Sequence, residues 1–413
     1  MGSAEKSSLP GESPASDALT FNVLIVGSGV AGLSAAISCR EQGFDVVVVE
    51  ASPEFTHVGA GVFLGGNATR ILCEMGLQEE MEKYAAQQQR TVFVDLQDGK
   101  TLQVMEFSEL QAKIGWPLWQ MHRADLHTVL LNRARELGVQ IRMGIPIKTY
   151  DPSKPAVITE EGTVLTADVI LAADGYRSPA RSSLLGGISE PRPSGNSAFR
   201  ALIPCETLKQ IPELEDYISW EAQTTHVWVG EGKHVVAYPI RQGEYYNIVT
   251  TQPAVHTKDS KYVAKIDRSE VLKNYDAEPR LMTILKHLPK DVLEWRLCDL
   301  APLESWIFPG GRIVLLGDAS HAMLPSAAQG AGMGIEDGAA VAELLSRAKS
   351  VSGIPAALAS FEELRKPRCT AIMTGARIDA DAWHGKDAGT EVSTTWSWDY
   401  DAKGAARNAV IIA

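Results

Sequence analysis

The stretch from residue 23 to residue 50, VLIVGSGVAGLSAAISCREQGFDVVVVE, limits the possible folds of this chain more than any other feature. It reads as a strand, a glycine turn, a helix and a second strand in immediate succession. Residues 23–26 and 46–49 are short apolar runs of the kind that buried strands of a parallel sheet show. The pattern predicts a Rossmann-type βαβ unit, and therefore an α/β fold built on a parallel sheet.

Three glycines in this unit, Gly27, Gly29 and Gly32, stand at the G-x-G-x-x-G spacing. Gly27 suits a tight turn, Gly29 lets backbone approach a pyrophosphate, and Gly32 allows close packing of helix on strand. The phosphates would lie at the positive end of the helix. Glu50 can accept a hydrogen bond from a ribose hydroxyl and opposes a phosphorylated one, which favours FAD or NAD over NADP. The alternative, a glycine turn without a ligand, is weakened by the flanking strands and by Glu50.

Composition excludes several classes of function. The chain has 413 residues, of which 45% are hydrophobic and 22% charged, as is ordinary for a soluble globular protein of roughly two or three domains. A net charge of −12 leaves no basic patch for nucleic acid or anionic lipid. The five cysteines are scattered and form no C-x-x-C pair, which predicts reduced thiols in a cytoplasmic protein and no metal site. Neither a membrane span nor a signal peptide is predicted.

Changes in composition and in hydrophobic pattern along the sequence indicate where the domains lie. Residues 1–20 are rich in Ser, Pro and Ala without periodicity, which predicts a disordered leader. Residues 21–178 form the first part of the nucleotide-binding domain. Longer alternating stretches in residues 179–300 predict an inserted, mostly antiparallel sheet that forms a substrate-side domain.

The rest of the chain is predicted to return to the first domain. Residues 312–316 resume the parallel-strand pattern, so residues 301–378 complete the first domain. Two terminal helices are expected at 335–348 and 355–377, the first of them just after a glycine-rich turn. Residues 379–413 are rich in Trp, and we assign them no role.

Three local predictions accompany this outline. Asn67 is expected to cap a helix that runs through residue 75. Residues 92–96 and 102–107 are expected to pair as a hairpin across an Asp-Gly turn. Residues 268–294 show helical patterns.

Four motifs recur in the order typical of one enzyme family: VGSGVAG at 26–32, HRADL at 122–126, ADGYRS at 173–178 and LLGDASHAMLPSAAQGAGMGIED at 315–337. With them the chain resembles the FAD-dependent aromatic hydroxylases, the group A flavoprotein monooxygenases that include salicylate hydroxylase and p-hydroxybenzoate hydroxylase. The resemblance covers nearly all of residues 21–378. Together the motifs are far more specific than the first one alone.

The resemblance implies further FAD contacts late in the chain. Asp318 follows a parallel strand, and its carboxylate can accept hydrogen bonds from the ribityl hydroxyls. The helix that begins near Gly332 would point backbone N–H groups of Gly330, Ala331 and Gly332 at the isoalloxazine ring.

Two further contacts are implied by the middle motifs. Arg123 in HRADL contacts FAD in the family. Asp174 could touch the pyrophosphate, and in the family its dipeptide with Gly175 is thought to matter for NAD(P)H as well. The alternatives are a surface or capping role for Arg123, a turn-forming role for Asp174 and a capping role for Asp318.

The family's reaction is hydroxylation or epoxidation of an aromatic, phenolic or related small molecule. NAD(P)H reduces the flavin, dioxygen adds to give a flavin hydroperoxide, and the distal oxygen passes to an electron-rich carbon. The chain shows no second dinucleotide-binding unit, so the nicotinamide would bind transiently over the flavin. An aromatic acid, a phenolic polyketide and an indole alkaloid all remain possible substrates.

Arg200 and Tyr238 match positions where related fungal hydroxylases carry a functional Arg and Tyr. Arg200 would hold a phenolate or carboxylate, and Tyr238 would orient the substrate or relay a proton. The alternatives are a salt bridge on a strand face and a core tyrosine. His226 and His321 are lesser candidates for proton transfer, with His226 expected to be an exposed strand residue.

Two other functions stay open on the sequence. Escort proteins that bind prenylated GTPases share this fold without oxidising anything. A flavin oxidase or dehydrogenase would use the same cofactor without transferring an oxygen atom.

Overall fold

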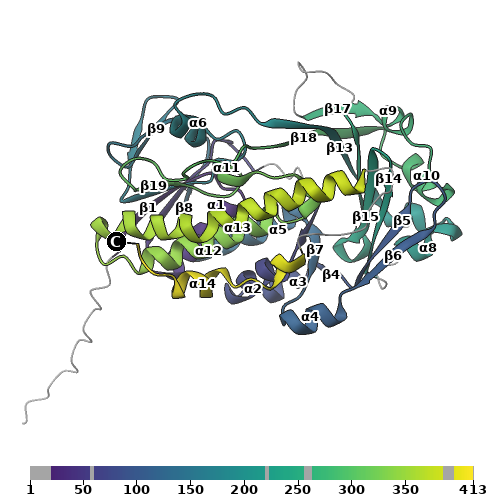
Figure 1. Ribbon diagram of the computed structural model, residues 1–413, viewed down its shortest axis with the longest axis horizontal. Helices are drawn as coiled ribbons and strands as arrows, with labels where there is room; N and C mark the ends of the chain where they lie inside the picture. The colour runs from purple at the N-terminus through teal and green to yellow at the C-terminus, as the bar shows by residue number, and fades with distance from the viewer. Residues whose placement is uncertain (1–19, 56–59, 219–222, 255–262, 385–394, 413) are drawn as a thin grey trace, which may run out of the picture.

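The computed structural model describes residues 20–55, 60–218, 223–254, 263–384 and 395–412. Apart from Thr20, the predicted leader lies outside these residues. The chain forms a parallel sheet and a larger, mostly antiparallel sheet, and the long helix α13 (Ile354–Trp383) runs from one to the other (Figure 1). None of the helices in these ranges is long and apolar enough to cross a membrane.

The parallel sheet has five strands in the order β19-β12-β1-β2-β8. Helix α1 (Val30–Glu41) connects β1 to β2, which confirms the predicted βαβ unit. The order places β1 between its own successor and strands from much later in the chain, so the strand order reverses there. The strands are β1 (Asn22–Val26), β2 (Asp45–Val49), β8 (Gln140–Arg142), β12 (Val169–Ala172) and β19 (Ile313–Leu315).

Helices cover one face of the parallel sheet, and a small sheet covers the other (Figure 1). The helical face holds α1, α5 (Arg123–Glu136) and α12 (Gly330–Ser346). The opposite face holds α6 and an antiparallel sheet of three short strands. These elements are α6 (Pro179–Leu185), β9 (Ile147–Asp151), β10 (Ala156–Thr159) and β11 (Val164–Thr166).

Helix α12 begins five residues earlier than predicted. Gly330 is its first residue, so the expected glycine turn at 330–334 is helical. Close packing on α1 explains why glycines are used there. A Cβ on Gly334 would lie 2.9 Å from the Cβ of Ala31, and one on Gly338 would lie 2.6 Å from the backbone nitrogen of Ala35. The helical conformation is stabilised by this packing rather than by intrinsic propensity.

The second sheet has eight strands in the order β17-β18-β13-β16-β15-β14-β5-β6. All neighbours are antiparallel except β14 and β5. The predicted hairpin is present as β5 and β6, and it extends this sheet although it precedes residue 179. The strands are β5 (Arg90–Asp95), β6 (Thr101–Glu106), β13 (Arg192–Pro204), β14 (Thr224–Gly230), β15 (Lys233–Ile240), β16 (Tyr245–Pro253), β17 (Val263–Asp267) and β18 (Asp291–Asp299).

The two faces of the second sheet have different environments. The outer face packs against short helices through a core that includes Phe199, Val235 and Ile248. The inner face is turned toward the first domain. The prediction of helix through residue 294 is wrong at its end, because β18 begins at Asp291 and its burial alternates. The helices are α7 (Cys205–Lys209), α8 (Glu215–Ile218), α9 (Arg268–Leu272) and α10 (Pro279–Lys286).

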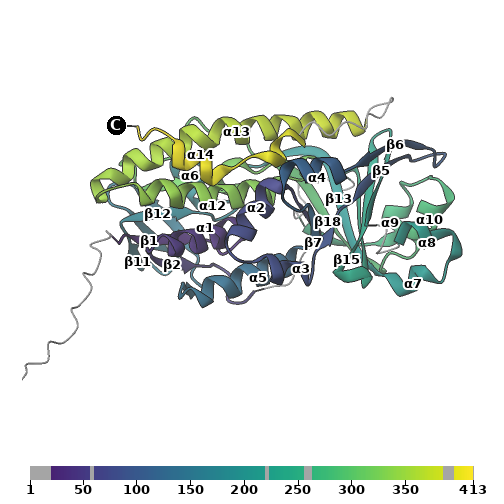
Figure 2. The same ribbon diagram turned by 90° about the horizontal axis from the view of Figure 1, so that it is seen from below.

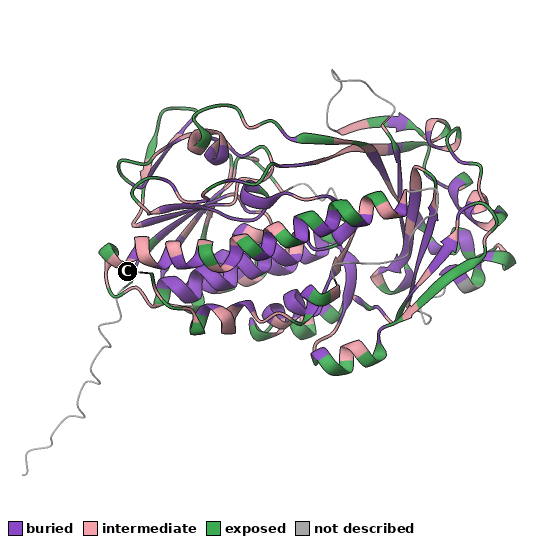
Figure 3. Cartoon of the chain, in the orientation of Figure 1, coloured by how far each residue is buried: buried purple, intermediate pink, exposed green. Residues whose placement is uncertain are grey.

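A small three-stranded sheet and its helices lie between the two large sheets. The predicted capping role of Asn67 is wrong, because it lies inside α2 and its side-chain amide donates to Gln329 and Glu336. Nearly all residues of α12 are buried, as the colouring by burial shows (Figure 3). The remaining elements are β3 (Gly61–Leu64), β4 (Ala86–Gln87), β7 (Trp119–His122), α2 (Gly66–Glu74), α3 (Gln78–Glu82), α4 (Ser108–Ile114), α11 (Asp318–His321) and α14 (Ala402–Asn408).

The turn between β15 and β16 fastens the second sheet to the first domain. Arg241 and Gln242 both have left-handed backbone, with φ of 49° and 54°. Arg241 donates two hydrogen bonds, of 2.8 and 2.6 Å, to the carboxylate of Asp125 near the start of α5. The Gln242 amide donates to the carbonyl of Lys83 at 3.2 Å. Left-handed backbone at residues with a Cβ costs free energy, so these bonds hold the turn in a strained conformation.

Substitution with glycine should separate strain from bonding in this turn. Gln242→Gly is expected to stabilise the protein by about 0.5 kcal/mol, because it relieves the left-handed strain and loses one weak hydrogen bond. Arg241→Gly is expected to destabilise it by about 2 kcal/mol, because the bidentate ion pair is lost as well. Urea unfolding of both variants measures this. Equal losses of stability would contradict the proposed strain.

Candidate functional site

Four strands of the parallel sheet end side by side at one edge, and each end carries a residue singled out by the sequence. In spatial order these are Glu50 after β2, Gly27 after β1, Asp174 after β12 and Asp318 after β19. Glu50 and Asp318 are three strand separations apart, or roughly 14 Å. An extended dinucleotide bridges such a distance, and ligands of α/β sheets bind at this edge.

The glycine turn after β1 has the geometry of a phosphate cradle. Gly27 has φ of +99°, and a Cβ there would lie 2.3 Å from the carbonyl oxygen of Ala173. A Cβ on Gly32 would lie 2.0 Å from the carbonyl oxygen of Gly27, so helix and turn are in direct contact. Among the described residues, nothing lies within 4 Å of a Cβ on Gly29, and no side chain caps α1. The helix therefore presents its free N–H groups to open space, which fits the pyrophosphate of FAD.

Glu50 is anchored beside this cradle. One carboxylate oxygen accepts from the backbone N–H of Ser28 at 2.9 Å and from its hydroxyl at 2.6 Å. The other accepts from the backbone N–H of Ser52 at 2.9 Å. Burial raises the pKa of Glu50, but these hydrogen bonds outweigh it and leave the pKa below its ordinary value. An ionised carboxylate in this position retains a lone pair for a ribose hydroxyl.

Asp318 lies at the far end of the same edge. It is exposed and is the first residue of α11, after Gly317 with φ of +58°. A buried carboxylate fixes this turn: the N–H of Gly317 donates to Asp337 at 2.9 Å. The guanidinium of Arg181 donates to the carbonyls of Ala319 and Ser320. The Asp318 carboxylate is thus free to point outward from a rigid turn.

Asp174 is also anchored, but through only one of its two oxygens. One oxygen accepts from the Tyr150 hydroxyl at 2.9 Å and from the backbone N–H of Ala180 at 3.0 Å. The other oxygen is buried and has no hydrogen-bond partner within the described ranges. Burial raises the pKa of Asp174. A turn-forming role for Asp174 is therefore visible, and its unpaired oxygen leaves room for a further donor.

Two helix starts face the same region. The first residues of α12, Gly330, Ala331 and Gly332, have N–H groups without partners inside the helix, since the first α-helical bond runs from Met333 to Gln329 at 2.8 Å. Arg123 is the first residue of α5, and it is exposed. Both positions suit a ligand with negative charge or carbonyl oxygens.

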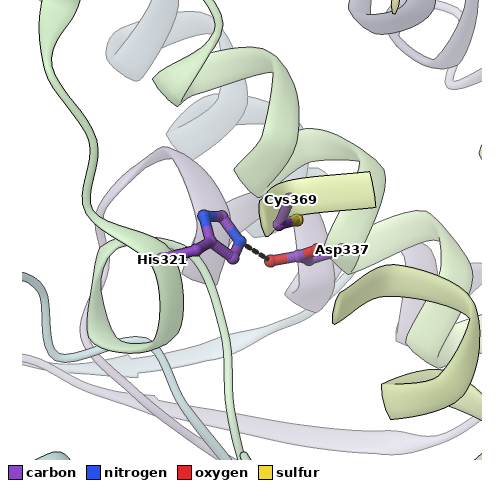
Figure 4. Close-up of side chains that lie close together, drawn as sticks. All are labelled: His321, Asp337 and Cys369. Atoms are coloured by element: carbon purple, nitrogen blue, oxygen red, sulfur yellow. Dashed lines mark hydrogen bonds and ion pairs between the residues drawn. The ribbon is translucent and has the colours of Figure 1, made fainter. Parts of the chain in front are cut away.

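Behind the Asp318 turn lies a buried cluster of His321, Asp337 and Cys369 (Figure 4). The atoms of these three residues that could bind a metal lie within 4.8 Å of one another. Asp337 is already engaged, by the His321 imidazole at 2.6 Å and by the Arg365 guanidinium at 2.9 Å. Burial lowers the pKa of His321, but Cys369 and Asp337 raise it well above its ordinary value. A fixed guanidinium beside these groups opposes a cation, so we assign the cluster to holding the turn.

The inner face of the second sheet carries both predicted substrate residues. Arg200 on β13 pairs with Val249 of β16, which in turn pairs with Val236 of β15. Tyr238 is two residues beyond Val236, so its side chain is on the same face as that of Arg200. The Trp295 ring centroid on β18 lies 5.8 Å from the Arg200 guanidinium.

The electrostatics of this face favour an anion. The Arg200 Nε is buried without a hydrogen-bond partner in the described parts of the chain. Burial and the nearby charge of Arg123 lower the pKa of Arg200, and burial raises that of Tyr238. An incoming carboxylate or phenolate would satisfy this donor and compensate the partly desolvated charge.

Sequence reasoning missed a residue that joins the inner face to the first domain. Asn247 is fully buried opposite Tyr238, and its side-chain oxygen accepts from the N–H of Gly61 on β3 at 2.7 Å. A Cβ on Gly61 would lie 2.2 Å from the Tyr238 hydroxyl. A buried Asn in an alternating strand carries no motif, so only its polarity at an inner position could have drawn attention to it.

His226 is not the exposed strand residue that we expected. It is 6% exposed, pairs with Ala237 and therefore lies on the outer face, away from Arg200. Its ring stacks on Tyr217 at 4.2 Å between centroids. Burial, with the nearby charges of Arg90 and Arg280, lowers the pKa of His226 to about 3. It is a neutral core residue that cannot reach the inner face.

Comparisons with known proteins agree with this geometry. Residues 20–376 match the model of the FAD binding domain family. FAD-dependent monooxygenase OpS4 of Beauveria bassiana (strain ARSEF 2860) is 35% identical over 85% of this chain and 83% of its own length. 3-Hydroxybenzoate 6-hydroxylase 1 of Aquipseudomonas alcaligenes is 31% identical over 88% of this chain and 90% of its own length. The solved structure of CtdE with FAD and a substrate has a TM-score of 0.84 at 24% identity, covers 94% of this chain and 97% of that one, and shows the shared fold.

Proposed function

Since this chain belongs to the FAD-dependent monooxygenases, which use NAD(P)H and dioxygen, we propose that it hydroxylates or epoxidises an aromatic small molecule bound against the inner face of the second sheet. The observation that carries this proposal is the half-buried Arg200. Its buried Nε, without a hydrogen-bond partner among the described residues, shares that face with Tyr238. An aromatic compound with an ionisable hydroxyl or carboxyl group fits such a donor. The name of one relative, 3-hydroxybenzoate 6-hydroxylase 1, refers to a compound with both a hydroxyl and a carboxyl group.

FAD would be held along the carboxyl edge of the parallel sheet. The adenine half would lie near Gly27, Gly29 and Glu50, with the pyrophosphate at the start of α1. The ribityl chain would reach Asp318, and the isoalloxazine ring would lie at the first turn of α12. Arg123 and Asp174 would contact the cofactor from either side. When bound and reduced, FAD supplies the activation of dioxygen.

The protein's own residues would position the substrate and keep water away. Arg200 would hold the acidic group of the substrate, and Trp295 would support the guanidinium from the strand alongside. Tyr238 would donate or accept a hydrogen bond at the substrate hydroxyl, because ionisation of a phenol raises its reactivity. The nicotinamide would bind transiently.

Isotope labelling with the purified holoenzyme, which follows where the oxygen atoms of dioxygen go, tests the proposal. Aromatic acids and phenols are screened for faster oxidation of NADH or NADPH, and the product is then examined after reaction under labelled dioxygen. Incorporation of one labelled oxygen atom per product is expected. Substrate-dependent reduction of dioxygen to hydrogen peroxide, with no label in the product, would instead indicate an oxidase.

A further inference from the structure

The Trp-rich end of the chain returns to the first domain and packs on α2 and α12. After α13, residues 395–400 and α14 run along α2 and α12, as the yellow end of the chain in Figure 2 shows. We call residues 395–400 the C-terminal strap. A salt bridge of 2.7 Å between Arg70 on α2 and Asp401 fastens its end.

Trp398 is the strap's buried anchor. It is 4% exposed, and its ring centroid lies 5.0 Å from that of Phe63 on β3. A Cβ on Gly65 would lie 2.9 Å from the Trp398 indole, and one on Gly66 would lie 2.8 Å from the Trp398 carbonyl oxygen. The strap therefore packs closely on the start of α2, together with Asn67 Oδ1, 2.7 Å from a Cβ on Gly65, and Ile114 Cγ2, 2.5 Å from one on Gly66.

A second contact joins the strap to α12 through Arg368 of α13. Its guanidinium donates to the Ser397 carbonyl at 2.8 Å and makes two bonds, of 2.8 and 2.7 Å, to the carboxylate of Glu336. The ring centroid of Tyr400 lies 3.9 Å from the same guanidinium. Glu336 is fully buried on α12. Charge-assisted hydrogen bonds of this kind resist rearrangement when they are buried away from water.

Asn67 closes the connection between the two contacts. Its side-chain amide donates to Glu336 at 2.6 Å and to the side chain of Gln329 at 3.0 Å. Gln329 is the residue immediately before Gly330, where α12 begins. The strap is thus linked through buried bonds to the β3–α2 turn and to the first turn of α12.

From this arrangement we propose that Trp398, in the C-terminal strap, is a positioning residue of the flavin-ring site. It acts through Gly65, Gly66 and Asn67, and it fixes the turn that faces the first N–H groups of α12. Because interiors are close-packed, removal of the indole allows both turns to shift. The inference rests on the proposed placement of the flavin ring at α12.

The two tryptophans of the strap provide a matched test. Trp398→Ala is expected to raise the dissociation constant of FAD at least tenfold and to change the visible absorption spectrum of the bound flavin. Trp396→Ala is the control, because Trp396 is 56% exposed and stacks on Arg368 at 5.5 Å. It should change the dissociation constant less than twofold. FAD is removed from the holoenzyme, and binding is followed by quenching of flavin fluorescence.

The outcomes separate this proposal from simple destabilisation. Thermal unfolding of each apoprotein is measured in parallel. If Trp398→Ala lowers the melting temperature but leaves FAD affinity and the flavin spectrum unchanged, the strap is only structural and the proposal is overturned. If that variant does not fold, Trp398→Phe decides: a threefold or larger loss of affinity supports the proposal, and unchanged affinity with an unchanged spectrum overturns it.

A separate variant tests the placement of the cofactor. Asp318→Asn should weaken FAD binding, since Asp318 is proposed to contact the ribityl chain itself. Unchanged affinity there would overturn the placement on which the strap proposal depends. Weakened binding in Asp318→Asn with unchanged binding in Trp398→Ala would overturn the strap proposal alone.

Discussion

A Gly29→Ala variant should fold normally and yet be purified without its yellow cofactor. No atom of the described residues lies within 4 Å of a Cβ at this position, and Gly29 has no left-handed backbone, so the added methyl group should cause no strain there. It does occupy the space at the start of α1 where the pyrophosphate is proposed to lie. We expect FAD affinity to fall about 100-fold, which corresponds to ~2.7 kcal/mol. Absorbance near the flavin bands and the melting temperature of the apoprotein measure the two effects.

Gly32→Ala provides the contrasting control. A Cβ there would lie 2.0 Å from the carbonyl oxygen of Gly27, which is backbone and cannot move aside. This variant should lose folded protein as well as cofactor. If Gly29→Ala retains FAD at the wild-type affinity, the pyrophosphate does not lie in the cradle after β1.

Replacing Arg200 should remove turnover while leaving the flavin in place. Arg200 is half-buried, and its Nε lies buried on the inner face of the second sheet without a hydrogen-bond partner among the described residues. Loss of charge-assisted bonds to a bound anion should lower kcat/KM by roughly a hundredfold to a thousandfold in Arg200→Met, or about 3–4 kcal/mol. Arg200→Lys keeps the charge but loses the planar fork, so an intermediate loss is expected. Steady-state kinetics with the best substrate, together with FAD content, measure the effect.

Two further variants delimit this result. Arg192→Ala changes an exposed arginine on the same strand, paired with Asp299, and should leave kcat/KM within about twofold. Tyr238→Phe should cost about tenfold, since it removes one hydrogen-bonding group. Normal turnover in both Arg200→Met and Tyr238→Phe would show that the substrate binds elsewhere.

The sequence predicted the parallel sheet and the residues at its carboxyl edge from local signals. The glycine spacing and the acidic residue at the end of β2 follow directly from the needs of one turn and one strand end. Asp174 and Asp318 follow buried apolar runs, and parallel strands bring their carboxyl ends to one edge whatever their separation in the chain. The FAD fold and the family were therefore accessible before the structure, whereas the contacts of individual residues with FAD remain proposals.

What the sequence could not indicate depends on packing between distant segments. Gly334 reads as a turn residue, but it is helical because α12 presses on α1. Asn67 reads as a cap, but its amide is used by partners more than 260 residues away. His226 reads as exposed on an alternating strand, because the sequence cannot show that α8 covers that face. In each case tertiary contact overrides local preference.

The route of the chain between its sheets has a consequence for biosynthesis. Strand β5 leaves the ribosome early, but its parallel neighbour β14 follows more than a hundred residues later. Strand β19 completes the other sheet only at Leu315. On a nascent chain, each large sheet therefore stays incomplete until its last strand has left the ribosome. Such non-local pairing delays folding and leaves strand edges uncovered meanwhile. We therefore expect both domains to complete their sheets late, the parallel sheet only once Leu315 has emerged.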